Sequence, residues 1–409
     1  MKFPRSQFPI FLIVFITLNL ASPVVSSAAL VSQGFTNLTG TAERMISYRH
    51  QERFLMTDDG VQHLLINVGD RDEESKGALA LMTKEEGQAD WEEVIDLNCS
   101  NAESTADMVL DKNYLHIVYS CDKQVWYSRL SYDALTSTWW NLKTRRIFKG
   151  RLQTPSAPTI AMSSDRTLHV VFTQTNFNKV VQLVGYSSGS PLLRWVPTDT
   201  WGQANKRPAK AGRILSLETG MGLLYTDVSE ENDTARSTLN FVRTNEDGSW
   251  TAPVVLESTD AGFHDPYGSH YSAAVDDQGN IHLVWPVEKR LVYYRFDKAA
   301  DTWSANYILE KTHNAVYSQV AKHTDGRIFL IFNVGEQLQM VESDDYGLTF
   351  NHTAFLIHPT GDPLYDWAQP RVEAPAVFSG RLDVLQQLST VPTETVPAVE
   401  RLYLFSVTP

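Results

Sequence analysis

The sequence predicts an all-β fold, a single-domain β-propeller of six to seven four-stranded blades. A pattern of short strands recurs about every 50 residues, each copy turns at Asp or Gly, and each ends near an aromatic residue. Several short strands in each copy at such a period are typical of β-propellers. Because each blade needs its neighbour to cover its faces, the repeats are expected to close into a ring.

The clearest part of the repeat is a turn followed by an apolar run that often contains His. His63, His116 and His169 follow one another at intervals of 53 residues, and His282 stands 113 residues after His169. That longer interval equals two periods and leaves one degenerate copy. A catalytic residue need not recur at a fixed position, so we interpret these four histidines as blade packing or inter-strand hydrogen bonding.

The remaining copies are less regular. The degenerate copy is 214–225, which turns at Gly220, and the next copy has Phe329 at the position of the histidine. A weaker seventh copy covers 372–388. The aromatic residues that end the copies are Trp91, Trp139, Trp140, Trp195, Trp250, Trp303 and Phe350. At a fixed offset, we expect them to form wedges between neighbouring blades, where their large surface is buried.

The two ends of the chain are predicted to share one blade. The run 30–35 reads as a lone strand, and 401–407 alternates apolar and polar residues as a strand does. Pairing the first strand with the last would remove an open sheet edge. We therefore expect 30–35 to complete the blade that holds the C-terminal strand.

The first 28 residues read as a secretory signal peptide. An apolar run from Phe8 to Leu20 follows Lys2 and Arg5, and small residues follow at 26–28. No later stretch is long and apolar enough to span a bilayer. The prediction is a secreted chain whose residues 29–409 form the propeller, and we expect a monomer.

The formal net charge of −13 makes non-specific binding to nucleic acid or to anionic membranes unfavourable. An anionic substrate is still possible, because a local Arg cluster can outweigh the global field. Cys99 and Cys121 bracket the first strand of one blade, and in a secreted protein we expect them to form a disulfide. Two buried thiols are the alternative. Glycosylation sequons stand at Asn37, Asn98, Asn232 and Asn351.

The candidate site lies where the innermost strands of the blades begin. Loops entering these strands meet at one mouth of a propeller ring, so residues far apart in sequence would converge there. These residues are Glu52 and Arg53 in the first blade, Asp107 in the second, Arg213 in the fourth, His264, Asp265, His270 and Tyr271 in the fifth, Tyr317 and Gln319 in the sixth, and Asp366, Trp367, Arg371 and Glu373 in the seventh.

This set has the chemistry of a saccharide site. We assign substrate binding to Arg53, Arg213, Trp367, Arg371 and Glu373, because Arg pairs with carboxylates and aromatic rings stack on sugars. The candidate acids, bases and nucleophiles are His264, Asp265, His270, Tyr271 and Tyr317. The alternative for each residue is an ordinary strand end or a hydrogen bond between blades. The two histidines could also hold a metal, but no third ligand is evident. No metal is therefore predicted, and no cofactor is identified.

One segment resembles a known motif. Ser343-Asp344-Asp345-Tyr346-Gly347-Leu348-Thr349-Phe350 is similar to the Asp-box of the sialidase-like β-propellers, the hairpin turn between their outer strands. Residues 245–250 match the motif in part. In such a turn the Asp accepts backbone hydrogen bonds, Gly takes the positive φ, and the aromatic residue is buried. The motif marks the fold and carries no catalysis.

The resemblance implies two alternative reactions, and the residues do not decide between them. Sialidases of this superfamily use three Arg, a Tyr–Glu pair and an Asp, and Arg53, Arg213 and Arg371 could supply the Arg set beside Tyr317 or Tyr271. The propeller polysaccharide lyases use His and Tyr as base and acid, with Arg neutralising a uronate. His264, His270, Tyr271 and Arg371 would fit these roles.

The leading hypothesis is cleavage of an acidic glycan, such as one that contains uronate or sialate, by hydrolysis or β-elimination. A glycan-binding propeller without catalysis is the alternative. An interaction scaffold, or an enzyme of unrelated chemistry on the same ring, is a further one.

Overall fold

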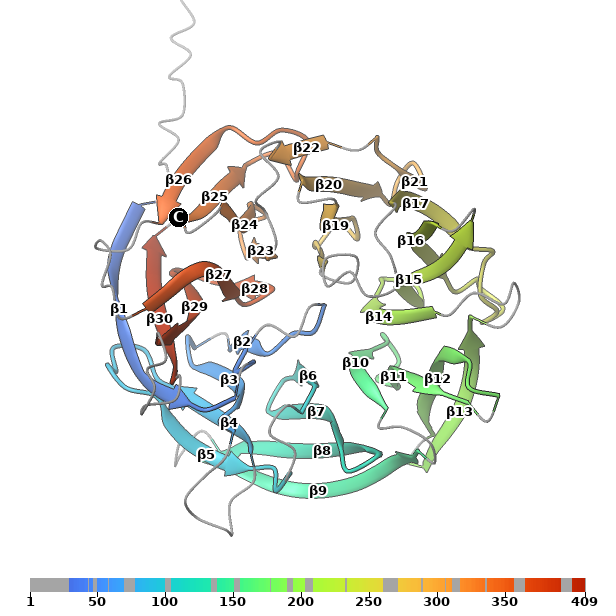
Figure 1. The fold of residues 1–409 in the computed structure, drawn as a ribbon, viewed down its shortest axis with the longest axis horizontal. Coiled ribbons are helices and arrows are strands. Elements are labelled where there is room, and N and C mark those ends of the chain that lie inside the picture. The colour runs from blue at the N-terminus through green and yellow to red at the C-terminus, as the bar shows by residue number, and fades with distance from the viewer. Residues whose placement is uncertain are drawn as a thin grey trace, which may run out of the picture.

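The chain folds into a ring of seven blades, each based on four antiparallel strands (Figure 1). The computed structural model describes residues 29–409 except 43, 47–49, 58, 70–77, 100–103, 134–137, 151–154, 177, 190–193, 203–208, 232–233, 260–270, 288–289, 306, 311–316, 335–336, 357–364, 391–398 and 409. Inside strands, the side chains of 229–231, 234–235, 259, 287, 308, 310, 352–355 and 365–370 are outside the description as well. The described residues include no helix long and apolar enough to cross a membrane.

The first four blades use consecutive strands, from the channel outward. They are β2 (Phe54–Met56), β3 (Gln62–Asn67), β4 (Leu79–Lys84) and β5 (Glu92–Asp96) in blade 1, β6 (Ala106–Asp111), β7 (Tyr114–Cys121), β8 (Gln124–Asp133) and β9 (Thr138–Lys149) in blade 2, β10 (Ser156–Met162), β11 (Leu168–Thr175), β12 (Val181–Gly189) and β13 (Arg194–Trp201) in blade 3, and β14 (Ala209–Ser216), β15 (Met221–Glu231), β16 (Thr234–Arg243) and β17 (Val254–Thr259) in blade 4.

The last three blades are less regular. They are β18 (Ser272–Val275), β19 (Ile281–Val287), β20 (Arg290–Asp297) and an outer strand in two pieces, β21 (Thr302–Trp303) and β22 (Tyr307–Glu310), in blade 5, β23 (Ser318–His323), β24 (Ile328–Val334), β25 (Gln337–Ser343) and β26 (His352–Leu356) in blade 6, and β27 (Tyr365–Glu373), β29 (Leu382–Thr390), β30 (Glu400–Thr408) and β1 (Ala29–Gly40) in blade 7. The short strand β28 (Val377–Phe378) leaves blade 7 to pair in parallel with β23 of blade 6.

The two termini close the ring as predicted. Strand β1 lies antiparallel to β30, with Leu30 opposite Val407 and Phe35 opposite Tyr403 (Figure 1). The N-terminal strand is therefore the outer strand of the blade that the C-terminal strand belongs to. The seventh copy of the repeat, left open by the sequence, is a complete blade.

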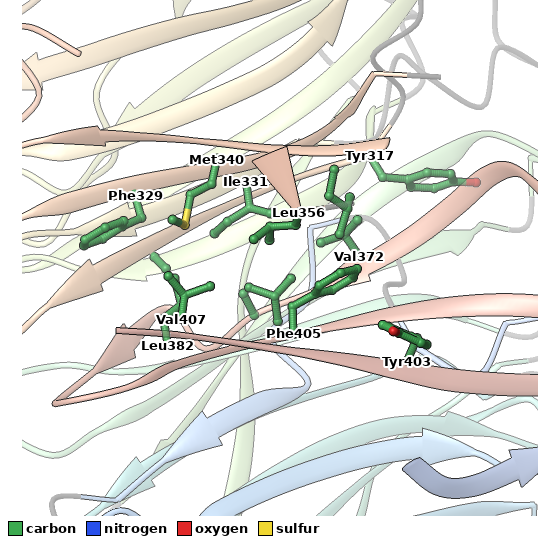
Figure 2. Close-up of a cluster of buried hydrophobic side chains, with 14 of the residues drawn as sticks. Tyr317, Phe329, Ile331, Met340, Leu356, Val372, Leu382, Tyr403, Phe405 and Val407 are labelled. Carbon is green, nitrogen blue, oxygen red and sulfur yellow. The ribbon is translucent and has the colours of Figure 1, made fainter. Parts of the chain in front are cut away.

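The hydrophobic core is divided among the interfaces between neighbouring blades. The described residues form seven buried clusters, and each joins one blade to the next. Figure 2 shows the interface of blades 6 and 7, where Phe329 and Met340 face Leu382 and Val407. Full burial of one such side chain is worth about 1.5–3 kcal/mol, so closing the ring is strongly favourable.

The wedge role predicted for the Trp residues is confirmed. Trp91 lies with Leu385 and Leu402 between blades 1 and 7, and Trp303 lies against Phe241, 5.2 Å between ring centroids, between blades 5 and 4. Trp140 is the exception, since it is 60% exposed beside the buried Trp139. Alternation along a strand explains this difference, because adjacent side chains point to opposite faces.

The repeat histidines lie on the second strands and hold neighbouring strands together. His116 Nδ1 is 2.7 Å from the hydroxyl of Tyr127, and His282 Nδ1 is 2.8 Å from that of Tyr293. His63 Nδ1 is 3.1 Å from Thr83 Oγ1. These contacts all cross from the second to the third strand, which confirms the structural interpretation of these histidines.

The turn 343–350 joins β25 to β26, the two outer strands of blade 6. Asp345 accepts hydrogen bonds from the N–H groups of Leu348 (3.0 Å) and Thr349 (2.8 Å) and from the Thr349 hydroxyl (2.7 Å). Gly347 has a φ of 76°, and its N–H donates to Ser343 Oγ. Side-chain acceptors therefore fix the hairpin, and Phe350 at its end packs against Tyr293 with ring centroids 4.9 Å apart.

The predicted disulfide is present. Cys99 and Cys121 are bonded, with Cα atoms 5.8 Å apart. The bridge brackets two strands rather than one, since Cys99 precedes β6 and Cys121 ends β7. Of the sequons, Asn37, Asn98 and Asn351 are exposed, whereas Asn232 lies outside the described residues. The Asn37 amide also hydrogen-bonds both backbone groups of Trp91.

Candidate functional site

Several of the described candidate residues meet at the start face, the face of the ring at which the inner strands begin. Backbone and side-chain hydrogen bonds connect the starts of these strands across several blades. The Met108 N–H donates to Glu52 O (3.1 Å), and the Ile160 N–H donates to Asp107 Oδ2 (2.7 Å). The Arg53 N–H donates to Glu373 Oε1 at 3.2 Å. Residues up to 320 positions apart in sequence therefore meet here, as the ring topology predicts.

A buried ion-pair cluster spans the channel beneath this face. Arg213 Nη1 on β14 lies 2.8 Å from Asp107 Oδ1 on β6, and Arg213 Nη2 lies 3.8 Å from Glu52 Oε2. The Arg213 side chain is only 12% exposed. Two carboxylates thus neutralise Arg213. It therefore links neighbouring blades and has little attraction for an anionic ligand.

Burial changes the protonation of this cluster. Desolvation raises the pKa of Glu52 well above its ordinary value, against the opposing effect of Arg213, and the nearby Glu373 raises it further. Desolvation also raises the pKa of Asp107, although Arg213 and two backbone N–H groups favour its charged form. Glu52 has fewer hydrogen bonds to its carboxylate, so it is the member that protonates more readily.

Arg53 and Glu373 are fully buried, which supports a structural rather than a ligand-binding role. The Arg53 guanidinium donates to the carbonyl oxygens of Ser104 (2.7 Å) and Met45 (3.4 Å). Both side chains have no exposed surface. Sequence could not separate them from surface residues, because charged residues at strand starts are usually exposed.

Tyr271 also has a structural role. Its hydroxyl donates to the carbonyl oxygens of Ala211 and, at 3.0 Å, of Leu224, and the residue is 1% exposed. Its ring stacks on His50 with centroids 5.4 Å apart. Burial raises the Tyr271 pKa far above its ordinary value. A hydroxyl held in this way is poorly placed to donate a proton to a ligand.

Arg371 and Tyr317 form a pair at the start face. The Arg371 guanidinium lies over the Tyr317 ring, 5.3 Å from its centroid. Arg371 is on β27 of blade 7, and Tyr317 immediately precedes β23 of blade 6. Arg371 is partly exposed, and the Tyr317 hydroxyl points away from the apolar cluster that its ring adjoins (Figure 2). Tyr317 is 8% exposed, so the pair presents mainly the Arg371 cation, backed by the Tyr317 ring.

The other predicted site residues cannot be placed. His264, Asp265 and His270 lie outside the described residues, and so do the side chains of Asp366 and Trp367. Among the residues that the structure does describe, no group of three or more His, Cys, Asp and Glu side chains has the arrangement of a metal site. The described part of the candidate site is therefore the Arg371–Tyr317 pair above the buried cluster.

The opposite face holds a cavity that the sequence did not predict. It has a volume of about 650 Å³ and is lined by the ends of the inner strands of blades 1 to 5, with Glu52 and Arg213 among its lining residues. The cluster thus separates this cavity from the start face. The residues that line the cavity are mostly apolar and lie in strands, so the sequence does not distinguish them from ordinary core positions.

Comparison with known proteins supports the fold and goes no further. The sequence matches no described protein family and no curated protein. Among solved structures, the polysaccharide lyase Uly1 superposes with a TM-score of 0.51 at 11% identity, over 90% of this chain and 92% of that one.

Two further solved structures cover much of the chain at lower similarity. A sialidase of Trypanosoma rangeli gives a TM-score of 0.46 at 10% identity, over 92% of this chain and 59% of that one. A lectin of Aleuria aurantia gives 0.44 at 13% identity, over 78% and 99%. At these identities the likeness to Uly1 establishes the shared propeller fold alone.

Proposed function

We propose that this protein is a secreted β-propeller that binds an acidic glycan at the start face and cleaves it by hydrolysis or β-elimination. The observation that carries the proposal is the Arg371–Tyr317 pair, which offers a carboxylate-binding guanidinium beside an aromatic ring. The fold shared with a polysaccharide lyase also supports a function in carbohydrate chemistry.

Electrostatics favours Arg371 as the residue that binds the anionic group of the glycan. A chain of net charge −13 needs a local cation to hold a negative sugar. Arg213 is neutralised by Asp107 and Glu52, and Arg53 is buried. Of the three arginines proposed as a set, Arg371 alone combines partial exposure with a position at the start face. Tyr317 is its aromatic partner, and His264, Asp265 and His270 complete the proposed catalytic set.

Secretion is part of the same proposal. The N-terminal 28 residues have the pattern of a signal peptide, and the Cys99–Cys121 disulfide is a bond that persists in oxidising compartments. The exposed sequon residues Asn98 and Asn351 are compatible with glycans at the surface.

Binding without cleavage is the second candidate. The position of Tyr271 favours it, because the hydroxyl proposed as an acid is buried and donates to two backbone carbonyls. If Tyr271 is not the acid, the proposed catalytic residues lack one member, whereas the Arg371–Tyr317 pair proposed for binding is unchanged.

One experiment separates these possibilities. The purified protein is incubated with uronate- and sialate-containing polysaccharides, and three signals are followed: reducing ends, absorbance of unsaturated products, and binding. Hydrolysis gives reducing ends alone, and β-elimination gives both chemical signals. Binding with neither indicates a lectin, and no binding to any acidic glycan would refute the proposal.

A further inference from the structure

The outermost strand of blade 2 carries a concentrated group of cations. Lys143, Arg145, Arg146 and Lys149 on β9 fall within seven residues of a chain whose net charge is −13. Arg145, Arg146 and Lys149 are exposed, and Lys143 is half-buried. Within the described part of the chain, none of the four forms an ion pair, and Arg146 donates to the uncharged Gln124 at 3.2 Å. No described carboxylate therefore pairs directly with these cations, although the acidic strand β5 packs beside β9.

Strand register places these cations on both faces of β9. Lys143 is opposite Arg129 and Arg145 is opposite Tyr127, and the Tyr127 ring packs toward blade 3. Arg146 is opposite Trp126, which packs toward blade 1, and Lys149 is opposite Gln124 on that same side. Arg145 and Arg146 lie on opposite faces because they are adjacent in the strand, and the irregularity at Ile147 places Lys149 on the same face as Arg146. The edge thus presents positive charge to either side.

The cations also repel one another. Lys143 and Arg129 are directly opposed across β8 and β9, a like-charge pair that destabilises a sheet. Desolvation and the charges of Arg145 and Arg129 lower the pKa of Lys143. An anionic ligand lying along this edge would relieve that repulsion.

Protection of an open sheet edge does not explain the group. Charged residues on edge strands do prevent edge-to-edge association, yet the other outer strands are built differently. The described strands β1, β5, β13, β17, β21, β22 and β26 contain a single Lys or Arg among them, Arg194 on β13. Strand β5 is instead acidic, with Glu92, Glu93 and Asp96. The sign and the density of charge on β9 therefore need another cause.

Exposed apolar residues continue the same edge. Trp140 is 60% exposed and Leu142 is 47% exposed, both on β9 before the first cation. At about 3.3 Å per residue, the distance from Lys143 to Lys149 is about 20 Å. An exposed indole followed by a row of cations of this length suits an extended polymer that has both ring faces and anionic groups.

We propose that β9 is a binding surface for an acidic polysaccharide chain, with Trp140 stacking on a sugar ring and Lys143, Arg145, Arg146 and Lys149 pairing with its carboxylate or sulfate groups. This surface lies on the outer rim of blade 2, away from Arg371 and Tyr317. It does not rest on the function proposed for the start face, and the two can be tested separately.

The test compares binding of heparin, a sulfated polysaccharide, and of polygalacturonate, a uronate polysaccharide, to three full-length proteins. They are the wild type, the variant Lys143→Gln/Arg145→Gln/Lys149→Gln, and the control Lys112→Gln/Lys179→Gln/Arg194→Gln. The control removes three exposed cations from other edges and turns, so both variants have the same net charge of −16, which is −13 − 3. Circular dichroism and thermal melting establish that each is folded.

We expect the β9 variant to lose at least about tenfold in affinity for heparin, polygalacturonate or both, because three exposed ion pairs are removed at once. The salt dependence of its binding should also fall, because fewer counterions are released when fewer charge contacts form. The control should bind as the wild type does. Because the start face is proposed to bind acidic glycans as well, the same three substitutions on β9 are also made in the Arg371→Ala protein. A loss of affinity that persists there belongs to β9, so that failure here and failure at the start face are distinguishable.

Three results would overturn the proposal: no salt-sensitive binding of the wild type to either polysaccharide, equal losses in the β9 variant and the control, or stronger binding to phosphatidylserine vesicles than to both polysaccharides. The last result would identify the edge as a membrane-binding surface instead.

Discussion

At the scale of single residues, burial decides which polar side chains hold the fold and which can meet a ligand. The repeat histidines were predicted as structural from their recurrence alone, and His116 bonded to Tyr127 shows why this works. Arg53 and Arg371 could not be separated in the same way. Arg53 immediately precedes the inner strand β2 and Arg371 lies in the inner strand β27, and only the packing of neighbouring blades buries the first and leaves the second partly exposed.

The buried histidines predict an acid-sensitive fold. Burial lowers the pKa of His63 and of His116 to about 4, from an ordinary 6.5. The unfolded chain therefore takes up these protons first, so their stabilisation is complete above pH 6.5 and is lost as pH falls from 6.5 toward 4. Each histidine contributes up to about 3 kcal/mol.

This contribution can be measured by urea unfolding at pH 7 and pH 4.5. His116→Gln keeps a hydrogen-bonding side chain but cannot titrate, so its free energy of unfolding should change less between the two pH values than that of the wild type. Identical pH dependence of the two proteins would mean that His116 does not carry this linkage.

The ion-pair cluster predicts unequal effects of two similar substitutions. Asp107 accepts hydrogen bonds from Arg213, from the Glu52 N–H and from the Ile160 N–H, whereas Glu52 Oε1 accepts one from the Ala376 N–H. Asp107→Asn should cost about 3–5 kcal/mol of stability, as expected when a buried pair loses one partner. Glu52→Gln should cost much less, because Arg213 keeps its closer partner Asp107 and the Glu52 carboxylate accepts fewer hydrogen bonds. Thermal and urea unfolding at pH 7 measure both, and equal costs would contradict this account of the cluster.

At the scale of strands, the sequence predicted the repeating elements well and the exceptions poorly. The Asp and Gly turns and the Trp residues place most inner and outer strands correctly. The parallel pairing of β28 with β23 was not predictable, because a two-residue strand has no periodicity of its own. The irregularity at Ile147 that places Lys149 on the same face as Arg146 is also invisible without the register.

The disulfide stabilises blade 2 by linking the segment before β6 to the end of β7. The bridged residues are 22 apart, and closing a loop of this size is worth about 3 kcal/mol in the chain-entropy model. Cys99→Ser/Cys121→Ser should therefore lower the free energy of unfolding by about that amount. Urea unfolding measures it, with the wild type in reducing agent as the matched control. An unchanged midpoint in both would show that the bridge contributes nothing to stability.

At the scale of the whole molecule, ring closure was predictable because both chain ends carry strand patterns with no local partner. Blade 7 therefore combines strands from both ends of the chain, and β1 covers the edge of β30. The sequence could not predict the content of the channel, since the Glu52–Arg213–Asp107 cluster depends on residues from three different blades.

Closure by β1 predicts that the ring depends on residues 29–40. Their deletion exposes the edge of β30 and removes the buried Leu38 and the contact of Phe35 with Tyr403, whose ring centroids are 5.0 Å apart. We expect a loss of at least about 2 kcal/mol in stability and an increase in self-association through the open edge. Thermal melting and size-exclusion chromatography measure these, with a protein lacking only residues 1–28 as the control. A truncated protein that melts with the control and stays monomeric would contradict this prediction.

The most direct test of the start-face site is the response of acidic-glycan binding and turnover to substitutions of Arg371. A bidentate Arg–carboxylate contact is worth roughly 1.5–3 kcal/mol, so Arg371→Ala should lower affinity or kcat/KM for an acidic oligosaccharide by at least about tenfold. Arg371→Lys should recover only part of this, because an ammonium cannot make the paired contact. Arg194→Ala, an exposed arginine on β13, is the control and should have no effect. A folded Arg371→Ala protein that binds and processes the acidic glycan as the wild type does would contradict the proposed site.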